Sequence, residues 1–101
     1  MKPFNGHPSW NAWNTALWVS NDEHLYNTVN GIVKTLFYND ELKCSKDWRQ
    51  RILKYATQKV YRLIGGLKTP DGGVFNARCI KYICDDFLTD LENSAARREA
   101  I

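Results

Sequence analysis

The feature that most constrains this fold is a helical spacing of apolar residues along nearly the whole chain. Large apolar side chains fall three or four positions apart in four stretches, which puts them on one face of a helix in each. The alternation typical of a strand is nearly absent, except at Val74 and Phe75. The first two stripes are Trp10, Trp13, Leu17 and Trp18, then Leu25, Tyr26, Val29, Ile32, Val33, Leu36 and Phe37. The third is Trp48, Ile52, Ala56, Val60 and Leu63, with Leu53 and Ile64 at its edge, and the fourth is Ile80, Ile83, Cys84, Phe87, Leu88 and Leu91.

Capping residues and glycines predict where these helices begin and end. Ser9 suits the start of the first, and SNDE at 20–23 has the pattern of a capping box, with the Ser20 hydroxyl accepting from the Glu23 N–H. Ser45 and Asn76 suit the starts of the third and fourth helices. Gly65-Gly66 ends the third helix, and TPDGG at 69–73 is a turn signal before the last helix.

These signals predict an all-α fold, a compact bundle of three to four helices. We expect the helices over residues 9–19, 21–38, 45–64 and 77–93, and a polar connection at 38–45 with room for one helical turn. Residues 1–93 form a single helical domain, and residues 94–101 form a frayed tail because their apolar content is low.

The composition is that of an ordinary globular chain of 101 residues, 44% hydrophobic and 25% charged. No apolar run approaches the ~20 residues of a membrane span, and the N-terminal MKPFNGHP lacks the apolar core of a secretory signal. The three cysteines, Cys44, Cys79 and Cys84, form no CxxC pair and are odd in number, which argues against disulfides and a zinc site. We expect them to be reduced, mostly buried thiols of a cytosolic protein.

Motifs that carry catalysis are missing from the sequence. The chain has no phosphate-binding glycine loop, HExxH or GxSxG motif. It has two histidines, His7 and His24, but no recognisable nucleophile that either could activate as a base. The acids Asp85, Asp86, Asp90 and Glu92 are not joined by a histidine, so they predict a solvated face that can pair with bases of the third helix. We therefore predict a protein that is not an enzyme and has no catalytic residues, metal or cofactor.

Positive charge is concentrated in one segment. Residues 41–68 carry eight Lys or Arg against two acids, a net +6, whereas the whole chain is only +3. On the third helix one side gathers bases and amides, flanked by Tyr55 and Tyr61, which suits a phosphate backbone or the carboxylates of a protein partner. The predicted contact residues are Arg51, Lys54, Gln58, Tyr61 and Arg62. The alternative is a solvated face whose bases serve solubility.

Three of the four tryptophans lie close together in NGHPSWNAWNTALW, residues 5–18. Trp10, Trp13, Leu17 and Trp18 are most simply explained as core. Asn14 interrupts their stripe, and a buried amide must find hydrogen-bond partners. Either Asn14 fixes a loop against the helix, such as residues 4–8 or the TPDG turn, or a polar pocket lies beside the tryptophans. That pocket would comprise His7, Asn11, Asn14, Asn21 and Asp22.

The stretch NGHPSWNAWNTALWVSNDEHLY, residues 5–26, resembles the signature of a family of small uncharacterised proteins from tailed bacteriophages. That signature runs N-G-H-x-S-x-N-x-W-N-x-x-L-W-x-x-N-D-E-x-L-Y, and TPDGGVF at 69–75 resembles the family's element before its last helix. The resemblance implies a phage or prophage product in the host bacterial cytoplasm, and it implies no established activity. Phage proteins of this size are often host-takeover or anti-defence factors, anti-CRISPR proteins among them, which is an association by origin.

We therefore expect a phage accessory protein that acts by non-catalytic binding to a host protein or defence complex. One alternative is a nucleic-acid-binding protein that uses the basic third helix. Another is a small-ligand or nucleotide sponge that uses the N-terminal Trp/Asn cluster. The sequence does not indicate an oligomeric state.

Overall fold

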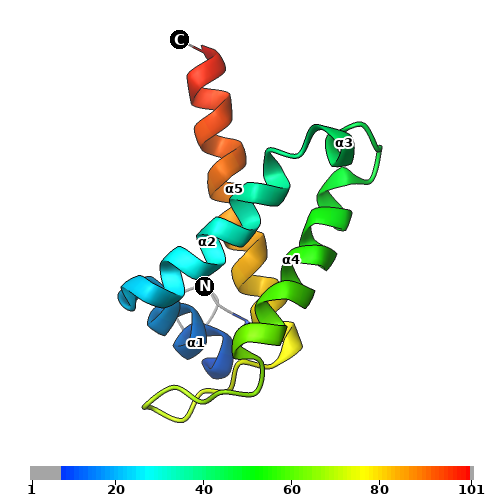
Figure 1. Cartoon of the computed structure of the whole chain (residues 1–101). Helices are drawn as coiled ribbons and strands as arrows, with labels where there is room; N and C mark the ends of the chain where they lie inside the picture. The colour runs from blue at the N-terminus through cyan, green and yellow to red at the C-terminus, as the bar shows by residue number, and fades with distance from the viewer. Residues whose placement is uncertain (1–7, 101) are drawn as a thin grey trace.

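The computed structural model describes the backbone of residues 8–100 and the side chains of residues 8–97. Within these residues five helices follow one another: α1 (Trp10–Asn21), α2 (Glu23–Phe37), α3 (Asp40–Lys43), α4 (Trp48–Ile64) and α5 (Ala77–Ala100). α5 packs against α1, α2 and α4, and α2 also packs against α4 (Figure 1). The all-α prediction is confirmed. There is one helix more than expected because the polar connection folds into the single turn α3.

The junction of α1 and α2 differs from the sequence prediction. Ser9 caps α1 as expected, since its hydroxyl accepts from the Ala12 N–H at 3.1 Å. The predicted capping box is wrong, because α1 continues to Asn21 and the N-cap of α2 is Asp22 rather than Ser20. The Asp22 carboxylate accepts from the Leu25 N–H at 3.0 Å, and the Asp22 N–H donates to the last turn of α1. A carboxylate is a stronger acceptor than a hydroxyl, and its charge suits a helix N-terminus.

Two other helix ends also shift. α4 begins at Trp48, after the predicted start near Ser45. Its N-cap is Asp47, whose carboxylate is bound by the Ser45 hydroxyl and by Arg51 and accepts no backbone N–H of the first turn. α5 starts where predicted, with the Asn76 side chain accepting from the Cys79 N–H at 2.8 Å. It continues to Ala100, through the segment expected to be a frayed tail, because SAARREA is rich in strong helix formers. Its last turns project beyond the other helices (Figure 1).

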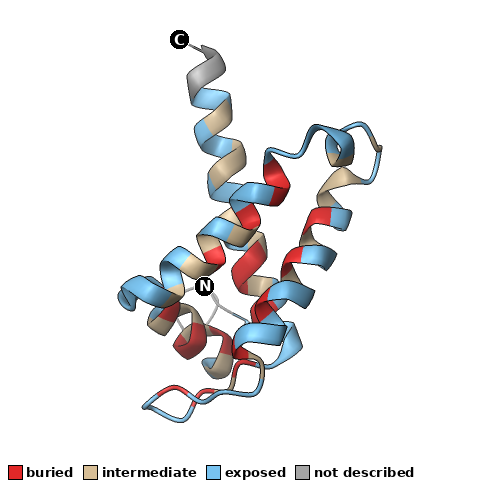
Figure 2. Ribbon diagram, viewed as in Figure 1, coloured by how far each residue is buried: buried red, intermediate tan, exposed pale blue. Residues whose placement is uncertain are grey.

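The main core lies between α2, α4 and α5 (Figure 2). On α4 the sequence placed Leu63 inside, but Leu63 is 60% exposed and Ile64 is buried instead. The inward residues of α4 follow the i+4 row from Ile52 to Ile64, which is inclined to the helix axis. The stripes predicted for α2 and α5 supply the rest, except that Tyr26, which was expected inside, is 43% exposed. Buried core residues are Val29, Val33, Leu36 and Phe37 of α2, Ile52, Ala56, Val60 and Ile64 of α4, and Ile80, Ile83, Cys84 and Leu88 of α5.

α1 is oriented opposite to the prediction. Trp10 is 40% exposed and Leu17 37%, while Trp13 and Trp18 are half-buried and outside the core cluster that the described residues form. The buried residues of α1 are Ala12, Asn14, Thr15 and Val19. Small side chains on that side let the helix come close to its neighbours. The Thr15 hydroxyl is satisfied within α1, donating to the Asn11 carbonyl at 2.8 Å.

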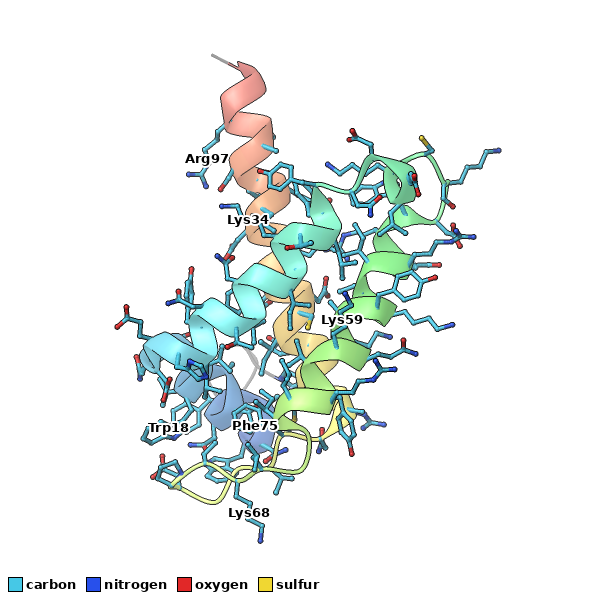
Figure 3. All side chains as sticks on the ribbon, in the orientation of Figure 1. Trp18, Lys34, Lys59, Lys68, Phe75 and Arg97 are labelled. Carbon is cyan, nitrogen blue, oxygen red and sulfur yellow. The ribbon has the colours of Figure 1, made fainter. Side chains whose placement is uncertain are left out.

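The connection between α4 and α5, residues 65–76, is a hairpin-like loop. Gly66 has a φ of 83°, a left-handed conformation that only glycine adopts readily and that stops α4 as predicted. Lys68 and Val74 form an isolated antiparallel bridge, and Gly72, with a φ of 96°, donates its N–H to the Thr69 carbonyl at 2.9 Å. These bonds close the TPDGG turn, from which Lys68 points away from the helices (Figure 3).

Candidate functional site

The five residues predicted to contact a partner lie on one outward side of α4. At about 100° per residue they span roughly a quarter of the helix circumference, opposite the buried row that starts at Ile52. All five side chains are exposed: Arg51, Lys54, Gln58, Tyr61 and Arg62. We call these five residues the basic face of α4. Tyr55 lies at its edge and is also exposed, so two tyrosine rings accompany the cations.

The cations of α4 differ in whether acids of the same chain neutralise them. Arg49 ties α4 to α5, because its guanidinium lies 2.8 Å from both the Asp85 and the Glu92 carboxylates. This pairing confirms that acids of the last helix bind bases of α4. Arg51 pairs on its own helix with Asp47 at 3.1 Å. Among the described residues Lys54 and Arg62 form no ion pair, so the basic face keeps a net positive charge.

The Asp47–Arg51 pair is ionised at neutral pH. The hydrogen bond from the Ser45 hydroxyl lowers the pKa of the Asp47 carboxyl, and the charge of Arg51 lowers it further. Because both groups are half exposed, water and salt screen their attraction. Arg51 therefore remains available to an external carboxylate.

Two shallow grooves run along the basic face. One of about 430 Å³ lies between α4 and α5, with Leu53 and Thr57 in its lining and Lys54 and Lys81 beside them. The other, of about 450 Å³, is lined by Asp47, Gln50, Arg51, Lys54 and Tyr55. Gln50 and Lys54 line both grooves. A ligand side chain on either side of Lys54 would meet apolar surface, an amide and a cation.

The asparagines of α1 bind the loop that precedes α5. The Asn11 amide makes two hydrogen bonds to the Val74 backbone: its nitrogen donates to the carbonyl at 2.8 Å and its oxygen accepts from the N–H at 2.6 Å. The buried Asn14 nitrogen donates to the Asp71 carboxylate at 3.1 Å, and its oxygen accepts from the Thr69 hydroxyl. Of the two accounts offered by the sequence, the structure supports the one in which Asn14 fixes the TPDG turn against the helix.

The other members of the predicted polar pocket lie elsewhere. Asn21 and Asp22 are at the opposite end of α1, roughly 15 Å from Asn11 along a helix that rises 1.5 Å per residue. Asp22 is used as the cap of α2, and Asn21 is exposed. His7 lies outside the described residues. Asn11 and Asn14 thus both contact the loop, whereas Asn21 and Asp22 lie far from both asparagines, so these residues do not form the predicted pocket.

Two features around α1 were not predicted from the sequence. Trp18 points toward the loop (Figure 3), where its indole N–H donates to the Asp71 carboxylate at 3.1 Å. Asp71 therefore binds Trp18 as well as Asn14. The outward position of Trp10 and Leu17 was also missed. The sequence did contain a signal for this outward position. WNAWNTALWVSN has no charged residue that could form a solvated face, so apolar residues must lie on the outer side of α1.

Nucleophilic chemistry is not favoured at the buried thiols. Burial raises the pKa of Cys84 to about 12, although the neighbouring Thr57 hydroxyl lowers it, so this thiol stays protonated at neutral pH. Cys79 is buried, whereas Cys44 is exposed, which corrects its expected place among mostly buried thiols. In the described part of the chain, no three His, Cys, Asp or Glu side chains gather where they could hold a metal. No helix within it is long and apolar enough to cross a membrane.

Comparison with known proteins identifies a family. The chain belongs to a family of unknown function, DUF7249, whose profile matches residues 1–94. That match includes all of α1 to α4, the hairpin-like loop and most of α5. No curated protein and no solved structure matches the chain.

Proposed function

We propose that this member of the DUF7249 family is a non-catalytic binding protein that contacts an acidic surface of a host protein through the basic face of α4. The observation that carries the proposal is the contrast between Arg49, which acids of α5 neutralise, and Lys54 and Arg62, which no described acid of the chain pairs. Arginine and tyrosine, which the basic face presents at Arg51, Arg62 and Tyr61, are among the residue types enriched where proteins meet.

Two further observations support a protein partner. The grooves on either side of Lys54 offer apolar lining as well as charge, which suits side chains of a protein more than a uniform phosphate backbone. The resemblance of residues 5–26 to small tailed-phage proteins supports a partner in the bacterial cytoplasm, such as a component of a defence complex. An anti-CRISPR-like inhibitor is one form that such a binding protein takes.

The test is affinity capture from a bacterial lysate with three versions of the full chain. The first is the unchanged protein, and the second carries Lys54→Glu and Arg62→Glu. The third is a matched control with Lys34→Glu and Lys68→Glu, which changes the net charge equally at exposed positions outside the basic face. Circular dichroism checks that all three are folded.

We expect the unchanged protein and the control to capture the same host protein and the basic-face variant to lose it. Equal capture by all three would refute the assignment of the surface. Titration with duplex DNA separates the nucleic-acid alternative. That alternative predicts affinity falling with salt at a log–log slope of about −0.9 per phosphate contacted, and loss of this binding in the basic-face variant.

A further inference from the structure

The outward side of α1 is apolar where a surface helix is normally charged. Trp10, Trp13 and Leu17 fall at i, i+3 and i+7, and we call these three residues the tryptophan face. No residue of α1 carries a charge. The inward side is already occupied by Asn14, Thr15 and Val19, so the indoles are not needed to fill the core. Exposed tryptophan on a charge-free helix face is typical of a protein-binding surface.

Next to the tryptophan face, two hollows adjoin between α1, α2 and α5. The smaller, of about 200 Å³, is lined by Trp13 and Leu17, and the larger, of about 320 Å³, by Tyr26 and Phe87. Both hollows include Ala16, Ser20 and Asp86, so they form one continuous groove. The rings of Tyr26 and Phe87 lie 5.1 Å apart and make one wall of it.

The charge of this groove is opposite to that of the basic face of α4. The exposed Asp90 lines it, together with Asp86, which already has an interaction within the chain. A carboxylate such as Asp90 beside the rings of Tyr26 and Phe87 suits a guanidinium or ammonium group, which can pair with the acid and stack on the ring. The apolar surface of Leu17 and Trp13 then suits an adjacent aliphatic or aromatic side chain.

We infer that the tryptophan face and its acidic groove form a second docking surface, which binds a protein segment that presents an arginine or lysine next to an apolar side chain. This surface is separate from the basic face of α4. Because its charge has the opposite sign, the acidic partner proposed for α4 does not fit it. The protein would therefore join two partners, or two parts of one partner, of opposite charge.

The experiment selects ligands from a random 12-residue peptide library displayed for binding to the full chain. Two variants are used for counter-selection, so that only peptides dependent on the groove are kept. One carries Trp10→Ser and Leu17→Ser, and the other Asp86→Asn and Asp90→Asn. The Lys54→Glu and Arg62→Glu variant of the basic face is the matched control, because it leaves this groove intact.

We expect groove-dependent peptides to share a basic residue beside an apolar one. A synthetic peptide of that consensus should bind the unchanged chain and the basic-face variant equally. It should bind each groove variant at least about tenfold more weakly, as truncation of an interface anchor does. If the variant with Trp10→Ser and Leu17→Ser folds poorly, loss of peptide binding by the Asp86→Asn, Asp90→Asn variant still tests the inference.

Three outcomes would overturn the inference. They are a consensus of acidic peptides, no enrichment that depends on the groove, or a concentration-dependent dimer that Trp10→Ser and Leu17→Ser abolish. The last, measured by sedimentation, would assign the tryptophan face to a second copy of the chain. Acidic peptides that are selected without the counter-selection and lose binding to the Lys54→Glu, Arg62→Glu variant would instead support the function proposed for α4, so the two proposals fail separately.

Discussion

α1 and α4 are both amphipathic helices, but they use their apolar sides in opposite ways. α4 turns Ile52, Ala56 and Val60 into the core and its charges outward, as a surface helix usually does. α1 turns Trp10 and Leu17 outward and buries Asn14 and Thr15. The comparison shows that the burial of a helix face depends on what covers it. α4 is covered by apolar side chains, whereas α1 is covered partly by a loop whose polar groups need amide partners.

The largest expected effect distinguishes a buried from an exposed apolar residue of α4. Ile52→Ala should lower the free energy of unfolding by about 3–4 kcal/mol, because Ile52 is fully buried and a cavity would remain. Leu63→Ala, the control at an exposed position in the last turn of α4, should change it by less than about 0.5 kcal/mol. Urea denaturation measures both. A large loss with Leu63→Ala would mean that the register of α4 is misplaced.

The next effect tests the polar burial of α1. Asn14→Leu should cost about 2–3 kcal/mol, because the Asp71 carboxylate and the Thr69 hydroxyl would each lose a partner. Asn21→Leu makes the same chemical change at an exposed position of the same helix and should cost less than about 0.5 kcal/mol. Equal midpoints in urea for the two variants would contradict the loop contact.

A smaller effect separates the paired cation from the unpaired one. Arg49→Gln should destabilise the protein by about 1 kcal/mol, since it removes the ion pairs to Asp85 and Glu92 at half-exposed positions. Lys54→Gln should leave stability unchanged within about 0.3 kcal/mol. The difference should shrink in 1 M salt, which screens exposed pairs. A loss of stability larger than this from Lys54→Gln would mean that Lys54 stabilises the fold and is not reserved for a partner.

The last comparison concerns the tryptophan face, where we expect little change in stability. Trp10→Ser and Leu17→Ser should each change stability by less than about 0.5 kcal/mol, because neither side chain belongs to the core cluster. Val19→Ala, on the buried side of the same helix, should cost about 1–3 kcal/mol. If the serine variants were as unstable as Val19→Ala, α1 would be packed through its tryptophans after all.

Periodicity predicted the fold class and the inward sides of α2 and α5, because in both helices the apolar stripe is also the packed stripe. It failed on α1 because spacing locates an apolar face without showing what covers either side. The partners of Asn11 and Asn14 lie more than 50 positions away in the chain. The start of α2 was predicted wrongly because the Asp22 carboxylate, a stronger hydrogen-bond acceptor than the nearby Ser20 hydroxyl, caps the helix.

For the candidate sites, the sequence located the five residues of the basic face on one side of a helix. It did not separate Arg49 from the unpaired bases, because that distinction depends on where α5 crosses α4. The groove beside Trp13 was beyond sequence reasoning for the same reason. Its carboxylates come from α5 and its tryptophan from α1.

The hydrogen bonds between α1 and the 69–74 loop have a consequence for synthesis. Trp18 and Asp71 are separated by 53 positions, and Asn11 and Val74 by 63. Contacts of such high sequence separation form late, because the intervening chain must first be made and ordered. Until residue 74 has left the ribosome, Asn11, Asn14 and Trp18 lack the partners that their polar groups have in the folded protein. During that interval the incompletely folded nascent chain is prone to aggregate, and chaperones are what normally prevents this.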